Sequence, residues 1–148
     1  MEDAPKNDAP KNDTSAEASP QRLSTIATDP ETFLASLKWD ANGLIPAIAQ
    51  DAAGGQVLMM AWMNAQSLLE TIHTKRVTYW SRSRAALWRK GDTSGHVQDL
   101  VDLRVDCDRD CLLMLVNQTG AACHTHRRSC FYTALRDDTE VELMPPME

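Results

Sequence analysis

The chain has 148 residues, 43% of them hydrophobic, and a formal net charge of −6 at pH 7. This length suits one domain with its own core, and the negative charge opposes extended contact with nucleic acid. Apolar runs fall short of the roughly 20 residues that cross a membrane, so we expect no membrane contact.

The first 28 residues are rich in Pro, Asp, Asn, Lys, Ser and Ala, and they repeat the sequence DAPKN at 3–7 and 8–12. Such a segment buries too little apolar surface to offset the entropy of ordering, so 1–28 is predicted to be a disordered acidic tail. It also lacks the apolar stretch of a secretory signal, which indicates a cytoplasmic protein with reduced cysteines. One folded domain is expected over 29–148.

Order is predicted to begin with a short helix in TDPETFLASLKW. Thr28 or Asp29 would cap this helix, with Pro30 in its first turn. The segment 43–64 follows, in which two apolar runs flank the turn sequence DAAGG. This pattern predicts a β-hairpin.

A second helix is predicted over 64–76, with Asn64 as its N-cap. Its apolar stripe consists of Leu68, Leu69 and Ile72. The sequence VTYWS at 77–81 is rich in strand formers and predicts a short strand. The polar, basic and glycine-punctuated segment 81–96 predicts a loop.

The second half of the chain is predicted to contain strands. Residues 97–106 place four apolar side chains largely on one face, namely Val97, Val101, Leu103 and Val105. A turn at 108–110 leads to an apolar strand at 111–118, and further strands are expected at 130–135 and 141–144. The expected fold class is α+β, with a mainly antiparallel sheet and one or two helices.

All four cysteines fall within residues 104–130, close to three aspartates. If the chain is extended as it enters the turn, Asp106, Asp108 and Asp110 share one face and Cys107 points to the other. Clustered carboxylates suit a magnesium-like ion, whereas thiolates suit a zinc-like one. The segment therefore predicts a hard metal site and a soft one back to back.

Cys123 and Cys130 are natural partners for Cys107 in the soft site. Zinc held by these three thiolates keeps its fourth position open for water, which is the catalytic arrangement. If Cys111 joins them, the site closes and becomes structural. Four strand residues span about 13 Å, too far for Cys107 and Cys111 to share an ion unless the turn shortens that distance. We favour the open site, and the closed one remains an alternative.

Two histidines accompany the last cysteines. His124, beside a presumed zinc ligand, is the candidate for proton transfer near pH 7. His126 is expected at the surface or close to the ligands. His73, at the end of a helix, and His96, after a Ser-Gly pair, are expected to be structural.

The basic stretch after the predicted strand at 77–81 offers groups that suit a nucleotide. Guanidinium and ammonium groups bind phosphate oxygens, hydroxyls add donors, and an indole can stack on a base. The candidate binding residues are Arg82, Arg84, Trp88, Lys90, Thr93 and Ser94. Alone, this stretch is explained equally well as a solvated charged loop, and its combination with a metal site favours the binding role.

The sequence resembles the phosphoribosyl-AMP cyclohydrolase family of histidine biosynthesis. The matching stretches run in the family's order over about 39–132: GLIPAIAQD, VLMMAWMN, YWSRSR, LWRKGDTSGHVQ, VDCDRD and ACHTHRRSCF. Two features depart from the family pattern. SGH stands where SGN is more usual, and Cys111 is not a family feature.

The resemblance implies an intertwined homodimer whose zinc is held by Cys107, Cys123 and Cys130, at least partly across the subunit interface. It also implies magnesium at the three aspartates. Many relatives are fused to a phosphoribosyl-ATP pyrophosphatase domain, for which this chain has no room, so we expect a monofunctional enzyme.

The substrate implied by the resemblance is the small molecule N1-(5-phosphoribosyl)-AMP. Hydroxide from zinc-bound water, whose pKa lies near ~7, would attack C6 of the purine. Cleavage of the N1–C6 bond would open the ring to the formimino-aminoimidazole carboxamide ribotide, with His124 transferring the proton. Two other functions stay open: a non-catalytic zinc module that binds a partner through its acidic tail, and a hydrolase for another nucleotide.

Overall fold

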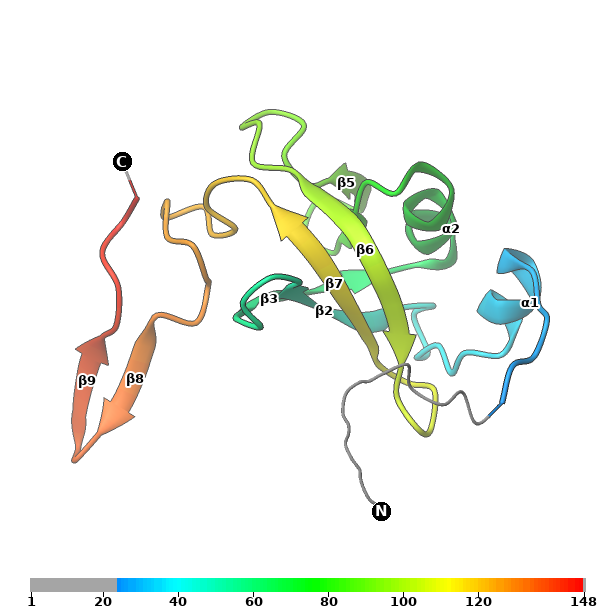
Figure 1. Cartoon of the computed structure of the whole chain (residues 1–148), viewed down its shortest axis with the longest axis horizontal. Coiled ribbons are helices and arrows are strands. Elements are labelled where there is room, and N and C mark those ends of the chain that lie inside the picture. The colour runs from blue at the N-terminus through cyan, green and yellow to red at the C-terminus, as the bar shows by residue number, and fades with distance from the viewer. Residues whose placement is uncertain (1–23, 148) are drawn as a thin grey trace, which may run out of the picture.

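Two helices and two sheets make up residues 24–147, the part of the chain that the computed structural model describes (Figure 1). The predicted tail 1–28 lies outside the described residues except for 24–28, which form neither helix nor strand. The larger sheet has six strands and is mainly antiparallel, and the smaller one is a two-stranded hairpin. The α+β prediction is confirmed.

Both predicted helices form, and their caps follow from local chemistry. Helix α1 (Pro30–Ala35) is capped by Asp29, whose carboxylate accepts a hydrogen bond from Thr32 N at 2.7 Å. Helix α2 (Ala65–Thr74) begins with a reciprocal pair, in which the side chains of Asn64 and Ser67 each accept the other's backbone N–H. Such caps satisfy amide groups that have no partner inside the helix. The predicted stripe of α2 is buried or half-buried against the core.

The predicted hairpin consists of β2 (Ile45–Asp51) and β3 (Val57–Met63). Asp51 closes the turn, because its N–H donates to Gln56 O at 2.7 Å and its carboxylate accepts from Gly54 N. Strand β2 also pairs with β7 (Leu112–Gln118), and this is a parallel pair within the otherwise antiparallel sheet.

The segment 81–96, predicted as a loop, contains a strand. Strand β5 (Ala86–Arg89) pairs with β4 (Thr78–Ser81), so that Trp88 lies opposite Tyr79. The prediction was wrong here because four residues, three of them apolar and consecutive, are too short a run to show strand alternation. Their order comes from the neighbouring strand and from the contact of Trp88 with Tyr79, whose ring centroids are 5.3 Å apart.

Strand β6 (Gln98–Val105) pairs with β7 but departs from strict alternation. The register shifts between Leu100 and Asp102, so one residue bulges out of the pairing. That residue is Val101, which is 55% exposed. The expectation that Val101 shares the buried face of this strand is therefore wrong.

The larger sheet curls back on itself. Its strand order is β5-β4-β3-β2-β7-β6, yet the chain just before β4 also bonds to β6. Val77 N donates to Gln98 O at 3.0 Å, and Leu100 N donates to Lys75 O at 2.8 Å. The curled sheet and the helices enclose the core, whose fully buried apolar side chains include Ile45, Leu58, Met63, Leu68, Val77, Tyr79, Leu112, Met114 and Val116.

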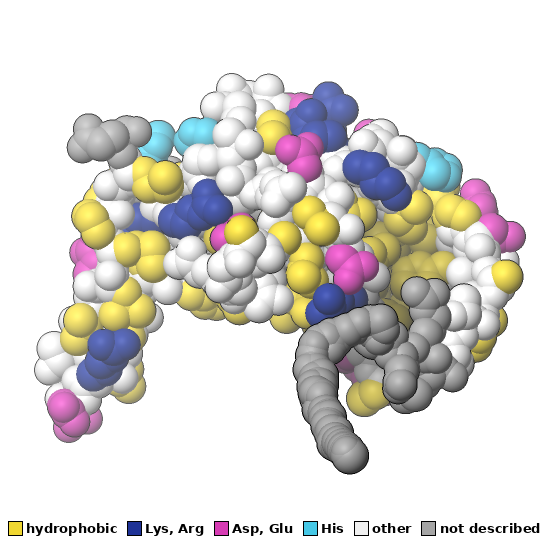
Figure 2. Space-filling view, viewed as in Figure 1, with side chains coloured by type: hydrophobic (Ala, Val, Ile, Leu, Met, Phe, Trp, Pro, Cys, Tyr) yellow, Lys and Arg dark blue, Asp and Glu magenta, His cyan; other side chains and the backbone are white. Residues whose placement is uncertain are grey.

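The last two strands form a hairpin that projects from the body, at the left of Figure 1. Strand β8 (Thr133–Arg136) pairs with β9 (Thr139–Glu142) through Asp137 and Asp138, both at positive φ. The predicted strands at 130–135 and 141–144 are thus present with shifted bounds. Hydrophobic side chains lie along this arm in Figure 2, and Leu135 is 76% exposed.

Neither helix within residues 24–147 is long and apolar enough to cross a lipid bilayer.

Candidate active site

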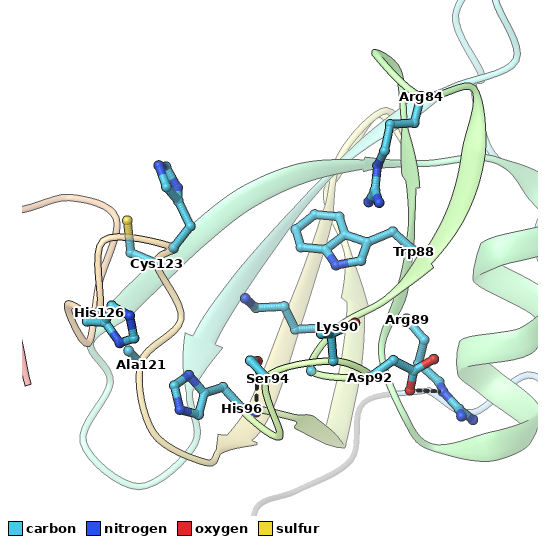
Figure 3. Close-up of a pocket in the computed structure, with 13 residues that line it drawn as sticks. Arg84, Trp88, Arg89, Lys90, Asp92, Ser94, His96, Ala121, Cys123 and His126 are labelled. Atoms are coloured by element: carbon cyan, nitrogen blue, oxygen red, sulfur yellow. Dashed lines mark hydrogen bonds and ion pairs between the residues drawn. The ribbon is translucent and has the colours of Figure 1, made fainter. Parts of the chain in front are cut away.

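A cavity of about 340 Å³ lies where two distant segments meet (Figure 3). One wall comes from β5 and the loop that follows it, and the other comes from the loop after β7. Seven residues singled out from the sequence line this cavity: Arg84, Trp88, Lys90, Thr93, Ser94, Cys123 and His124. The fold thus joins the candidate nucleotide-binding residues to one presumed zinc ligand and to the presumed acid–base residue.

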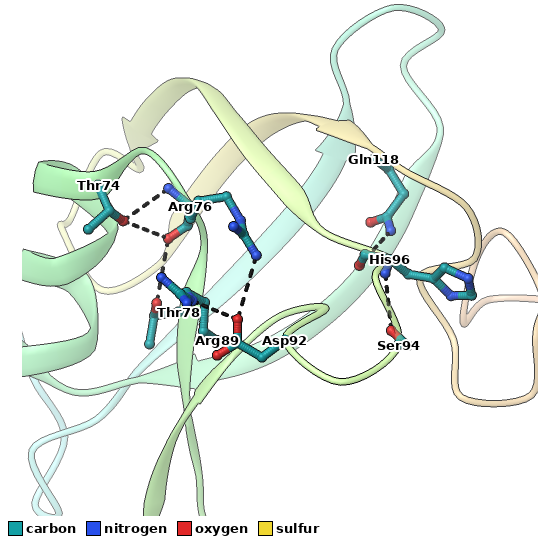
Figure 4. Close-up of polar contacts among 8 residues, drawn as sticks. All are labelled: Thr74, Arg76, Thr78, Arg89, Asp92, Ser94, His96 and Gln118. Atoms are coloured by element: carbon teal, nitrogen blue, oxygen red, sulfur yellow. Dashed lines mark hydrogen bonds and ion pairs between the residues drawn. The ribbon is translucent and has the colours of Figure 1, made fainter.

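Hydrogen bonds hold the loop between β5 and β6 at both ends (Figure 4). At one end, Arg89 Nε donates to the Asp92 carboxylate at 2.7 Å. At the other end, His96 N donates to Ser94 Oγ at 3.1 Å, and Gln118 Nε2 donates to His96 O at 3.3 Å. The loop is therefore a defined wall of the cavity.

A buried polar chain connects this wall to the core. Tyr79 OH donates to Gln98 Oε1 at 2.7 Å, and Gln98 Nε2 donates to Gln118 Oε1 at 2.8 Å. Gln118 then donates to the backbone of His96. Buried polar groups that satisfy one another in this way fix their neighbours in place.

The loop after β7 carries two neighbouring thiols. Cys123 is buried, and Thr125 Oγ1 donates to its sulfur at 3.0 Å. Cys130 is an exposed residue, but its N–H donates to Leu58 O at 2.7 Å, and the adjacent Ser129 is buried. Cys123 N also donates to Arg127 O at 3.1 Å, so backbone hydrogen bonds hold both cysteines.

The two sulfurs differ in acidity. Desolvation acts to raise the pKa of Cys123, but hydrogen bonds from Thr125 and interaction with Cys130 outweigh it, so this pKa is lowered. Desolvation and the neighbouring Cys123 raise the pKa of Cys130 to about 11. The ammonium of Lys90 acts on both thiols in the direction that favours thiolate. A divalent soft cation would be well matched to this pair.

Lys90 faces the loop after β7 that carries Cys123 and Cys130, called the cysteine loop from here on. It is buried, and its Nζ donates to Ala122 O at 2.7 Å. Burial lowers the pKa of Lys90, and the charges of Cys130 and Cys123 oppose this effect. The group predicted to bind phosphate is therefore already engaged within the protein.

Two further histidines reach the cavity: His126, which was expected at the surface or close to the ligands, and His96, which the sequence did not place there. His96 and His126 line it together with His124, and the rings of His96 and His126 meet edge to face with centroids 6.3 Å apart. His96 had been assigned a structural role because it follows a Ser-Gly pair. His96 reaches the loop after β7 only because the fold brings these two loops together. The one feature of the sequence that drew attention to this position is the SGH that stands where SGN is more usual.

Arg82 lies outside this cavity. Its guanidinium stacks over the Trp62 ring at 4.8 Å and lines a neighbouring groove with Trp80. Trp88 lines both the groove and the cavity, so the two are adjacent. Of the six predicted binding residues, Arg82 is the one that the structure places elsewhere.

The three aspartates come together, but not along a strand. Residues 106–110 form a turn in which Asp106 Oδ1 accepts hydrogen bonds from Asp110 N at 3.0 Å and Cys111 N at 3.2 Å. Carboxylate oxygens of Asp106, Asp108 and Asp110 lie within 4.8 Å of one another. The extended geometry was therefore wrong, since a turn rather than alternation gathers these side chains. Hydrogen bonds with Asp108 and Asp106 raise the pKa of Asp110 to about 6.

The cysteines lie at opposite ends of β7. Cys107 and Cys111 precede this strand, and Cys123 and Cys130 follow it. Seven strand residues cover roughly 20 Å at about 3.3 Å each. Among residues 24–147, the aspartates are the one group of three or more potential ligands that comes together. Neither the three-cysteine nor the four-cysteine site forms within the described part of a single chain.

Comparison with known proteins identifies the family of this chain. Residues 59–132 match the family described as phosphoribosyl-AMP cyclohydrolase, a stretch that contains the cavity, the aspartates and all four cysteines.

Relatives that carry this name cover most of the described chain. The Ruegeria pomeroyi protein is 70% identical over 119 residues, which are 80% of this chain and 97% of the relative. The protein of Dinoroseobacter shibae is 71% identical over 113 residues, 76% of this chain and 95% of its own. The Paracoccus denitrificans protein is 70% identical over 112 residues, which are 76% of this chain and 93% of the relative. The chain therefore belongs to the phosphoribosyl-AMP cyclohydrolase family.

Proposed function

We propose that the chain hydrolyses the N1–C6 bond of 1-(5-phosphoribosyl)-AMP in histidine biosynthesis, in the cytoplasm. The observation that carries this proposal is the cavity itself, where Cys123 and His124 face nucleotide-binding side chains from a separate loop. Family membership supports the choice of substrate, since the relatives are named for it.

The cavity offers groups for each part of this nucleotide. The indole of Trp88 provides a face for the purine, and Arg84 with the hydroxyls of Thr93 and Ser94 provides donors for a phosphate. The substrate carries two phosphates, and Arg82 stands beyond Trp88 in the adjacent groove, where it can serve the second.

The donor set fits zinc when two copies of the chain are combined. Cys123 and Cys130 would bind it from one copy, with Cys107 from the other. Zinc bound by three thiolates supplies hydroxide at neutral pH, because it lowers the pKa of a coordinated water to near ~7. Thr125 and the backbone contacts of Cys130 hold the two sulfurs of one copy side by side.

The homodimer is supported by the projecting hairpin as well as by the cysteines. An isolated two-stranded hairpin is marginally stable in water, and this one exposes Leu135 and leads from the exposed Phe131. A second copy would cover these side chains.

The aspartate turn would hold magnesium, because three exposed carboxylates within 4.8 Å of one another supply the oxygen ligands that this ion prefers. Asp108→Asn should weaken magnesium binding, measured by calorimetric titration. An unchanged affinity would exclude Asp108 as a ligand.

His124 would accept one proton from the attacking water and give it to N1 as the N1–C6 bond breaks. The second proton of the water would pass to the exocyclic nitrogen as C6 becomes the carboxamide carbonyl, so both protons are accounted for. Arg84 and Trp88 would hold the nucleotide so that its purine faces the cysteine loop. The rings of His96 and His126 meet where the two walls of the cavity adjoin, so they would border the same nucleotide.

Incubation of the purified protein with phosphoribosyl-AMP tests the proposal, with ring opening followed by ultraviolet absorbance. Cys123→Ala should abolish ring opening and lower bound zinc well below one ion per chain. Cys111→Ala is the matched control, because Cys111 is the one cysteine outside the three proposed ligands and should keep both zinc and activity. Loss of zinc from this variant as well would favour the closed four-cysteine site instead. Normal turnover by Cys123→Ala without zinc would refute the proposal.

A further inference from the structure

Lys90 has an unusual position for a lysine. It is 8% exposed and follows β5, where its N–H donates to Val77 O at 3.0 Å. Its side chain extends toward the cysteine loop (Figure 3). Its Nζ donates to Ala122 O at 2.7 Å, one residue before Cys123. One hydrogen bond thus joins two cavity walls that are far apart in the sequence.

The charge of Lys90 has few partners. Across residues 24–147, the ion pairs of the structure leave Lys90 without a carboxylate partner. Its Nζ lies 5.4 Å from the centre of the Trp88 ring, and its charge acts on the thiols of Cys123 and Cys130. A buried ammonium without a countercharge is costly, so its surroundings should hold negative charge when the protein functions.

We propose that Lys90 is a positioning residue of the zinc site: it anchors the cysteine loop through Ala122 and balances the charge of the sulfurs. Three thiolates around a divalent cation leave one net negative charge, which an adjacent ammonium offsets. This inference rests on the proposed function and assigns Lys90 a role other than the phosphate binding expected from the sequence.

Zinc affinity measured by competition with a chromophoric chelator tests this role on the full-length protein. Lys90→Met keeps the length and apolar stem of the side chain but removes the charge and the donor. Its zinc affinity should fall about 10–100-fold, the usual effect of losing a group that supports metal ligands. Lys75→Met is the matched control, because Lys75 is exposed at the C-terminus of α2, and its affinity should stay within about twofold of the original.

Two further variants separate the hydrogen bond from the charge. Lys90→Gln retains a neutral donor, and Lys90→Arg retains both donor and charge. Affinity should recover more fully with Arg than with Gln. Thermal unfolding of each variant identifies any that fails to fold, and the comparison of Gln with Arg remains valid if Met does not fold.

Kinetics at saturating zinc distinguish this role from phosphate binding. Lys90→Met should then leave the KM for the nucleotide within about threefold, because the missing group does not contact substrate. A large rise in KM with unchanged zinc affinity would overturn the inference, as would equal zinc affinities of Lys90→Met and the original protein. Absence of cyclohydrolase activity in the original protein would refute the proposed function instead, and the zinc affinities would still decide the role of Lys90.

Discussion

Glycine at position 120 leaves the space in which the His96 ring lies. Gly120 has a φ of +69°, and a Cβ at this position would lie 2.7 Å from His96 Cδ2. Position 120 therefore requires glycine for two reasons: its backbone is left-handed, and a Cβ would clash with the His96 ring. The His96 ring therefore packs against Gly120, and it also meets the His126 ring edge to face. These two contacts together position the imidazole.

Gly120→Ala should lower the free energy of unfolding and displace the His96 ring. The left-handed backbone alone costs an alanine about 1–2 kcal/mol. Gly43→Ala is the control for that cost, because Gly43 has a φ of +73° and open space around it. Urea unfolding should show a larger loss for Gly120→Ala than for Gly43→Ala. Equal losses would show that the contact with His96 contributes nothing.

His124→Ala should keep zinc but slow turnover about 10²–10⁴-fold, the usual contribution of a positioned acid–base group. His73→Ala, on the exposed surface of α2, should turn over at the original rate. Single-turnover rates with zinc content measured on the same samples check both variants. An unchanged rate for His124→Ala would remove this residue from the proposed mechanism.

The sequence indicates candidate ligands by residue type, but it does not show which residues will surround them in the fold. Residue chemistry singled out the thiols and the carboxylates as candidate ligands, because few other side chains bind metals. It missed the place of His96, since this depends on a contact between loops that meet only in the folded chain. It also could not show that Lys90 turns toward Ala122 rather than toward a ligand.

At the scale of elements, local signals succeeded where they were strong. Helix caps and the turn after β2 involve neighbours in sequence, and these predictions are confirmed. Strand β5 and the bulge at Val101 depend on a partner strand, so periodicity alone could not reveal them. The turn at 106–110 gathers its aspartates through hydrogen bonds to Asp106, which strand alternation does not describe.

The β8–β9 hairpin carries a prediction of its own. If a second copy covers Leu135, Leu135→Asp should raise the dimer dissociation constant about 10–100-fold, because burial of a leucine contributes about 1.5–3 kcal/mol. Sedimentation at several protein concentrations measures this constant. Ile26→Asp, an exposed apolar side chain outside the hairpin, should leave it unchanged. The same constant for Leu135→Asp and the original protein would show that the hairpin lies outside the interface.

The whole molecule explains why one chain cannot complete the proposed zinc site. Strand β7 lies inside the larger sheet, between β2 and β6. Cys107 lies before its first residue, and the Cys123–Cys130 pair lies after its last. A rigid strand of roughly 20 Å cannot bring these sulfurs together, but a symmetric dimer can place one end beside the opposite end of its partner. The family resemblance implied a zinc site shared across the subunit interface, and the separation of the cysteines along β7 is the physical argument that supports this proposal.

A mixed dimer tests this arrangement most directly. Chains carrying Cys107→Ala and Cys123→Ala are co-expressed with different affinity tags, and the heterodimer is isolated. One chain then supplies Cys107 and the other supplies Cys123 and Cys130, so one of the two symmetric sites is complete. We predict that both parent homodimers are inactive and that the heterodimer recovers about half of the original activity and zinc content. A heterodimer as inactive as its parents would contradict a site shared between chains.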